Sequence, residues 1–96
     1  MNRQEVLNQL KKYKQQNAQK YGIRQLGIFG SFARSQEQPD SDLDICIQTT
    51  IPNPFTIVHI KEDLENLFHL HIDIVRIRDH MNSYLKERIN KESIYV

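Results

Sequence analysis

The 96-residue sequence has a single cysteine, no long apolar run and almost no excess of either charge. Cys46 alone cannot form an internal disulfide, and the lack of a CxxC pair excludes the common cysteine-based zinc and redox motifs. No apolar stretch approaches the roughly 18 residues of a membrane-spanning helix. The residues after Met1 lack the apolar core of a secretory signal. We therefore expect a cytoplasmic protein, in a compartment where thiols stay reduced.

The charge balance and composition are those of an ordinary globular domain. Thirteen Lys and Arg residues face twelve Asp and Glu residues, and hydrophobic residues make up 39% of the chain. A protein held to nucleic acid mainly by a basic surface would carry a clear positive excess, so we expect no direct nucleic-acid partner and no membrane partner. The length allows one domain, residues 1–96.

Hydrophobic periodicity divides the chain into alternating helices and strands. Before Gly22, apolar residues recur at helical spacing, and the basic residues between them are interpreted as a solvated outer face. The other expected elements are a strand at Gln25–Gly30, a helical turn at Ser31–Arg34, a strand at Asp42–Gln48, a helix at Phe55–Leu70, a strand at His71–Arg76, a helix at Met81–Glu92 and an apolar tail at Ile94–Val96. This order predicts an α/β (α+β) domain, a small mixed β-sheet with helices packed on one face.

Aspartates gather on one face of the strand at residues 42–48. Side chains alternate along a strand, so its apolar residues share one face while Asp42 and Asp44 share the other, about 6–7 Å apart at their Cα atoms. Asp73 joins them if the strand at 71–76 is a neighbour in suitable register. Three carboxylates this close repel one another, and a hard divalent cation such as Mg²⁺ would relieve that repulsion.

Three such carboxylates can also hold two ions, the arrangement used for in-line displacement at phosphorus. The alternative is that each aspartate is an ordinary solvent-facing strand residue. That alternative weakens for the three together, because Asp is depleted in strands and like charges on one face cost energy.

The strand that ends at Gly30 supplies a second component. A strand turning into a helix at Gly30-Ser31 offers backbone N–H groups to an anion, and the Ser31 hydroxyl adds a donor. Arg34, three residues on, is expected on the same side of the turn as a further anion-binding residue. The segment is neither a Walker A loop, since no Gly-Lys-Ser/Thr follows, nor a GxGxxG dinucleotide fingerprint.

The combination of these segments resembles the nucleotidyltransferase superfamily that includes DNA polymerase β. The resemblance is carried by the sequence Gly30-Ser31-Phe32-Ala33-Arg34, the sequence Ser41-Asp42-Leu43-Asp44-Ile45, and the later Asp73 between apolar residues. The chain length and the tail Lys91–Val96 look like its minimal members, the MNT domains that act as antitoxins beside HEPN-domain toxins. One departure is Ser35, where many relatives have glycine after the arginine.

The resemblance implies the polymerase β-like fold and a Mg²⁺-dependent transfer of AMP from ATP to a tyrosine hydroxyl of a partner HEPN toxin. That transfer would silence the toxin, an RNase, within a hetero-oligomer. By the same resemblance, Gly30 and Ser31 hold the β and γ phosphates, and Asp42 and Asp44 bind the metal, two ions in all. Asp73 would be the third metal ligand and the candidate for aiding deprotonation of the attacking hydroxyl.

Two other functions remain open. The protein could neutralise its partner by binding alone, through apolar surface at Phe55, Tyr84, Tyr95 or Val96. It could also transfer a nucleotide to a small molecule or a nucleic acid, which the near-neutral charge and the lack of room for an acceptor domain disfavour.

The four histidines do not predict a zinc site. His69 and His71 flank a helix-to-strand junction and need not converge, and no cysteine pair supports a structural metal. His71 is expected on the Asp73 face of its strand, as a group that supports the acidic cluster.

Overall fold

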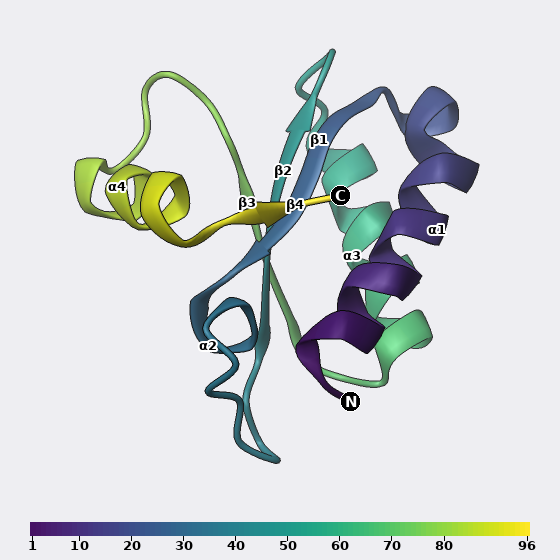
Figure 1. Ribbon diagram of the computed structural model, residues 1–96. Coiled ribbons are helices and arrows are strands. Elements are labelled where there is room, and N and C mark those ends of the chain that lie inside the picture. Colours follow the sequence, from purple (N-terminus) through teal and green to yellow (C-terminus); the bar gives the residue numbers. More distant parts are fainter.

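The computed structural model describes all 96 residues and shows a four-stranded sheet with helices on both sides (Figure 1). The elements in chain order are α1 (Arg3–Tyr21), β1 (Ile23–Phe29), α2 (Gly30–Ala33), β2 (Leu43–Thr49), α3 (Pro54–Phe68), β3 (Ile72–Arg76), α4 (Ser83–Glu92) and β4 (Ile94–Tyr95). None of these helices combines the length and the apolar character that crossing a membrane requires.

The sheet is mixed, as predicted, with the strand order β3-β2-β1-β4. β1 runs antiparallel to both β2 and β4, whereas β2 and β3 are parallel and connected through α3. β4 lies where the sequence indicated only an apolar tail. The tail pairs because the outer edge of β1 offers unpaired backbone groups, one of which, the Leu26 carbonyl, accepts a hydrogen bond from the Val96 N–H at 2.9 Å.

Asparagine begins each of the three long helices. Asn2, Asn53 and Asn82 each accept a hydrogen bond from a backbone N–H in the first turn of α1, α3 and α4. Such caps satisfy N–H groups that have no partner within the helix. α3 ends two residues before the predicted boundary, because His69 adopts a left-handed conformation (φ 54°) and closes the helix.

The main core lies between the sheet and the layer formed by α1 and α3, which cover the same face in Figure 1. Alternate residues of the two central strands, Ile28 of β1 and Ile45 of β2 among them, are fully buried against helix residues such as Leu10 and Leu64. The predicted layer of helices on one face is therefore confirmed for α1 and α3.

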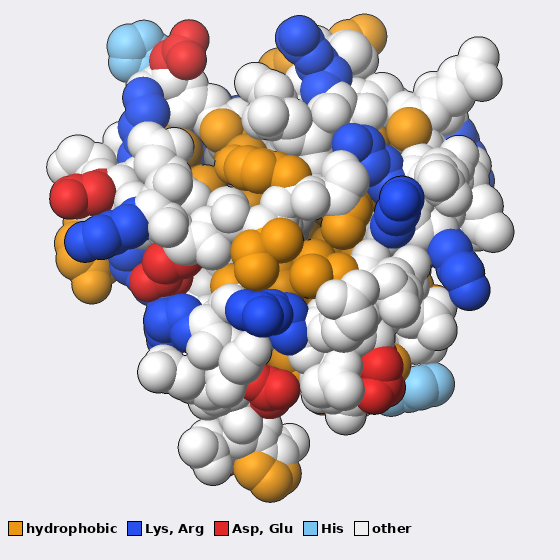
Figure 2. Space-filling model, viewed as in Figure 1, with side chains coloured by type: hydrophobic (Ala, Val, Ile, Leu, Met, Phe, Trp, Pro, Cys, Tyr) orange, Lys and Arg blue, Asp and Glu red, His pale blue; other side chains and the backbone are white.

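The other face of the sheet is only partly covered, by α4. Phe29, Cys46 and Ile89 form a separate small cluster there, with Leu85 and Val75 at its margin. α4 docks on this second face because Phe29 and Cys46 present an apolar patch, which the expectation of helices on one face alone did not include. Figure 2 shows apolar side chains gathered around the β4 end of the sheet, with Lys and Arg side chains around them.

Candidate functional site

Asp44 and Asp73 face one another across neighbouring strands. The two residues are Cα partners in the parallel pairing of β2 with β3. Partners in adjacent strands lie about 4.8 Å apart, and their side chains leave the sheet on the same side. Asp44 is also the partner of Phe29 in β1, so this side is the one that α4 covers in part. The predicted convergence of Asp44 and Asp73 is present in the fold.

The environment of Asp44 disfavours its charged form. Burial and the nearby carboxylate of Asp73, with a smaller contribution from Asp42, raise the pKa of Asp44 from 3.8 to about 6. The guanidinium groups of Arg88 and Arg34 oppose this rise without cancelling it. A half-buried acid with a raised pKa beside a second acid is the electrostatic pattern that a cation relieves.

Asp42 lies at the rim rather than in the centre. It directly precedes β2, its side chain is 56% exposed, and its Oδ1 lies 3.3 Å from Nδ1 of His71. His71, expected beside Asp73, therefore contacts Asp42. With the side chains in these positions, no group of three or more His, Cys, Asp or Glu residues has the geometry of a metal site.

Gly30 brings the backbone into direct proximity with Asp44. Its φ is +74°, a conformation that favours glycine, and a Cβ atom at this position would overlap Oδ2 of Asp44. Two features therefore favour glycine at position 30: the positive φ of the backbone and the lack of space for a Cβ atom beside Asp44. This proximity joins the two components that the sequence predicted separately, the Gly-Ser bend and the aspartate pair.

The residues after Gly30 form the single turn of α2 and its exit. Ser31 is half-buried in that turn, and Arg34 ends it as the C-terminal cap with an exposed side chain. Ser35 follows with φ at 55°. Glycine adopts this left-handed conformation without strain, so a glycine would fit at position 35.

Two residues of α4 complete the site, and the sequence reading did not identify either of them. Glu92 accepts a hydrogen bond from the Gly30 N–H at 3.1 Å and another from Arg34 Nη1 at 3.0 Å. Arg88 lies one turn earlier, with its guanidinium 5.7 Å from the centre of the Phe29 ring. Their spacing of four residues was visible in the sequence, but such pairs are usually ordinary helix-surface contacts.

The donor set suits a magnesium ion in type and in charge. Mg²⁺ prefers carboxylate oxygens, and burial together with the neighbouring Asp73 carboxylate raises the pKa of Asp44, so a cation would favour the charged form that this environment disfavours. Asp44 and Asp73 are already on the same face in adjacent strands. Asp42 would complete the set by rotation of its exposed side chain away from His71, since an exposed ion pair holds its partners only weakly.

Comparison with known proteins decides the class of the molecule. Residues 8–96 match the family described as polymerase beta, nucleotidyltransferase. The chain belongs to this family. A nucleotidyltransferase moves a nucleotidyl group to an acceptor, and Gly30, Asp44 and Asp73 are the residues of this chain that the fold brings together as candidates for that site.

Relatives of this nucleotidyltransferase include small archaeal proteins of the same length class. It is 30% identical over 94 residues to the protein adenylyltransferase MntA of Thermococcus cleftensis, covering 97% of this chain and 94% of the relative. It is also 30% identical over 95 residues to a Methanocaldococcus jannaschii protein described as a protein adenylyltransferase, with 96% and 95% covered.

Solved structures confirm the fold. A structure described as a minimal nucleotidyltransferase is 27% identical, with a TM-score of 0.79 over 98% of this chain and 95% of that chain. A Shewanella oneidensis complex of a tri-AMPylated HEPN toxin with its MNT antitoxin gives a TM-score of 0.71 at 16% identity, covering 97% of this chain and 70% of that chain.

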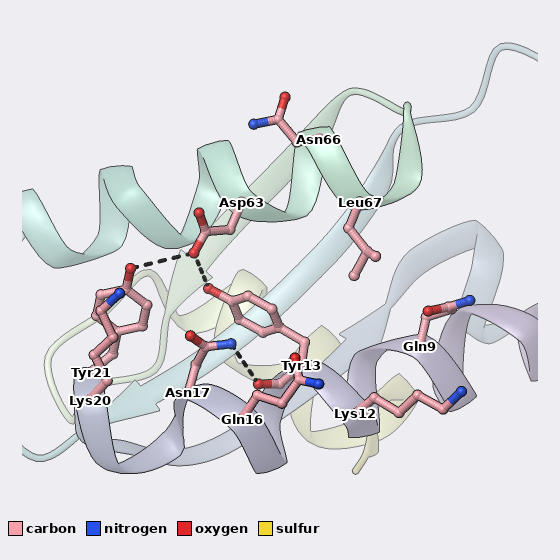
Figure 3. A pocket seen from close by; sticks show the side chains of 10 residues that line it. All are labelled: Gln9, Lys12, Tyr13, Gln16, Asn17, Lys20, Tyr21, Asp63, Asn66 and Leu67. Atoms are coloured by element: carbon pink, nitrogen blue, oxygen red, sulfur yellow. Dashed lines mark hydrogen bonds between the residues drawn. The ribbon is translucent and has the colours of Figure 1, made fainter.

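The largest pocket of the nucleotidyltransferase lies away from these residues. It measures about 670 Å³ and opens between α1 and α3, on the other side of the sheet (Figure 3). Asp63 accepts hydrogen bonds from the hydroxyls of Tyr13 at 2.8 Å and Tyr21 at 3.4 Å. None of the predicted site residues lines this pocket. The hydrogen bonds of Asp63 connect α3 to α1 there.

Proposed function

We propose that this protein transfers AMP from ATP to a tyrosine hydroxyl of a partner HEPN toxin and thereby neutralises it. The observation that carries the proposal is the pairing of Asp44 with Asp73 directly beside Gly30. The identity to the protein adenylyltransferase MntA over almost the whole chain supports protein as the acceptor. A hetero-oligomer with the toxin is the assembly that this reaction requires.

The reaction forms one bond at the α-phosphorus and breaks another. The tyrosine oxygen attacks the phosphorus, the bond to the β-phosphate oxygen breaks, pyrophosphate leaves, and the hydroxyl proton passes to a base. Asp73 is the base in this proposal, because it is exposed and faces Asp44. Gly30, Ser31 and Arg34 hold the β and γ phosphates through backbone N–H, hydroxyl and guanidinium donors.

Asp42, Asp44 and Asp73 would hold the magnesium, two ions in this proposal, which supplies charge neutralisation at the phosphates. The contribution of the chain itself is alignment. Asp44 and Asp73 lie on a sheet face fixed by the buried residues behind it, and the contact of Gly30 with Asp44 supports a phosphate position beside these acids. Fixed geometry of this kind lowers the entropic part of a transfer barrier.

The decisive test is transfer by the purified protein. With the partner toxin, ATP and Mg²⁺, mass spectrometry should show the partner gaining AMP. Asp44→Asn should reduce the initial rate by more than about a hundredfold, since even the outer hydrogen-bond partners of a metal site are worth 10–100-fold. Asp79→Asn is the matched control, because Asp79 is exposed in the loop after β3 and the same charge is removed.

A rate in Asp44→Asn equal to that of Asp79→Asn would remove Asp44 from the site. A complete lack of mass gain in the unsubstituted protein, under conditions where ATP binds, would count against transfer to the toxin.

A binding-only antitoxin is the second candidate, and exposed apolar side chains favour it. Phe55 at the start of α3 is 76% exposed, and Tyr84 on α4 is 71% exposed. Either could bury its ring against a partner. Expression of Asp44→Asn beside the toxin separates the two candidates: protected cells favour binding, and unprotected cells favour transfer. A Phe55→Ser variant that fails to protect while keeping transfer would show that contact is also needed.

A further inference from the structure

Glu92 is held more firmly than the other acidic residues around the site. Its carboxylate accepts hydrogen bonds from the Gly30 N–H at 3.1 Å and from Arg34 Nη1 at 3.0 Å, and Arg88 Nη2 lies 3.7 Å away. The Glu92 side chain is 20% exposed, compared with 56% for Asp42. Two hydrogen-bond donors from the start and the C-cap of α2, and one guanidinium from α4 itself, thus converge on a single carboxylate.

Two of these donors are the groups that the proposed function assigns to the triphosphate. The Gly30 N–H and the Arg34 guanidinium are bound to Glu92 through charge-assisted hydrogen bonds. Carboxylate and phosphate oxygens compete for such donors, because both are anionic acceptors with similar geometric demands. A donor N–H pointing at Glu92 cannot at the same time point at a phosphate oxygen.

Arg88 belongs to the same group of residues. Its guanidinium lies over the Phe29 ring, at the strand end from which Gly30 follows, and its charge lowers the pKa of Asp44 against the effect of burial. Arg88 is therefore close to the acidic pair as well as to Glu92. Loss of the Glu92 carboxylate would release two guanidinium groups, Arg34 and Arg88, from the ion-pair partner that they share.

We propose that Glu92 is an internal competitor for the triphosphate site: its carboxylate takes the place of a phosphate at Gly30 and Arg34, and its departure makes Arg88 a second cationic phosphate ligand. The inference rests on the proposed function only in that the site accepts a nucleoside triphosphate.

The exchange requires only a local motion. Glu92 is the last residue of α4, and its side chain turns about three single bonds. It can leave Gly30 while Ser93 N–H keeps its hydrogen bond to the Ile89 carbonyl at 3.0 Å and β4 stays paired with β1. Glu92 therefore sets the affinity for triphosphate without being part of the chemical step.

Inorganic tripolyphosphate is the probe, since it reports on phosphate binding independently of any acceptor. Titration calorimetry on the full chain should show Glu92→Gln binding tripolyphosphate about tenfold more tightly than the unsubstituted protein, because one anionic competitor is lost. Arg88→Gln should weaken binding by about tenfold. Glu87→Gln and Lys86→Gln, exposed positions on the same helix, are matched for charge and should change the affinity by less than about twofold.

Unchanged or weaker binding in Glu92→Gln, with the fold verified by circular dichroism, would overturn the inference, since Glu92 would then only position the arginines. A loss of Mg²⁺ binding in that variant would overturn it as well, by making Glu92 a metal ligand. Failure of AMP transfer to the toxin, with the tripolyphosphate affinities as expected, would refute the proposed acceptor and leave this inference standing.

Discussion

The two faces of the sheet differ in how completely they are buried. The face under α1 and α3 is part of a core of 15 buried residues, whereas the face under α4 buries only three. The same strand serves both: in β2, Ile45 is fully buried on the first face, and Asp44, one residue before it, lies half-buried on the second. The two faces of the sheet therefore have different roles. The face under α1 and α3 supplies most of the buried core that stabilises the protein, and the other face carries the acidic side chains, whose charges lower that stability.

The largest expected effect tests this comparison by truncating one leucine on each side. Leu64→Ala on α3 removes a fully buried side chain from the main core and should lower the free energy of unfolding by about 2–5 kcal/mol. Leu85→Ala on α4 removes a half-buried one at the margin of the small cluster and should cost about 1 kcal/mol. Urea denaturation measures both, and equal losses would mean that the α4 face is as important for stability as the other.

A second test introduces a side chain where the two components of the site meet. Gly30→Ala should lower the free energy of unfolding by about 1–3 kcal/mol, because alanine is strained at a φ of +74° and its Cβ must displace Asp44. AMP transfer should fall with it. Urea denaturation and the transfer assay measure the two effects. A variant of unchanged stability and activity would show that the structure accommodates a Cβ atom at position 30.

The Asp44 carboxyl should make the free energy of unfolding depend on pH. Since the pKa of Asp44 is raised from 3.8 to about 6 in the folded protein, its contribution to stability is full below pH 3.8 and is lost as the pH rises through 6. In buffer with a chelator, Asp44→Asn should therefore be more stable than the unsubstituted protein above pH 6, by about 1–2 kcal/mol once solvent screening is allowed for.

That difference should shrink towards pH 4. Urea denaturation at pH 4, 5, 6 and 7 provides the measurement, with Asp79→Asn as the control. A stability difference that does not change across these pH values would mean that the Asp44 carboxyl titrates as it does in the unfolded chain.

The smallest effect is expected in the loop that follows α2. Ser35 holds a positive φ of 55°, so Ser35→Gly should raise the free energy of unfolding by about 0.5–1 kcal/mol, the strain relief exceeding the added freedom of the unfolded chain. Thermal unfolding should show a small rise in melting temperature. Transfer activity should not change, because Ser35 lies outside the set of carboxylates.

Local patterns in the sequence predicted the positions of the two central acids and the end of α1 well. The alternation of β2 alone places Asp44 opposite the core, and the register with β3 then brings Asp73 to it. Gly22 closes α1 with a φ of 65°, as a glycine at that point indicates. These features depend on neighbours in sequence or on the burial of apolar side chains, and both are visible in the chain itself.

Long-range features were beyond the reach of such patterns. The pairing of β4 with β1 joins two segments nearly 70 residues apart, and the two residues of β4 are too few to show alternation. The side of the sheet that α4 covers depends on the small patch at Phe29 and Cys46. Glu92 reaches Gly30 across 62 positions, a contact that only the folded chain creates.

The parallel register of β2 with β3 also has a consequence for errors in folding. Leu43 pairs with Ile72 and Ile45 with Ile74, on either side of the two acids. A slip of β3 by a single residue would turn Asp73 into the hydrocarbon interior and push both isoleucines into water. A chain with the wrong register is therefore less stable than the native one. The burial of apolar side chains thus also selects the register that brings Asp44 and Asp73 together.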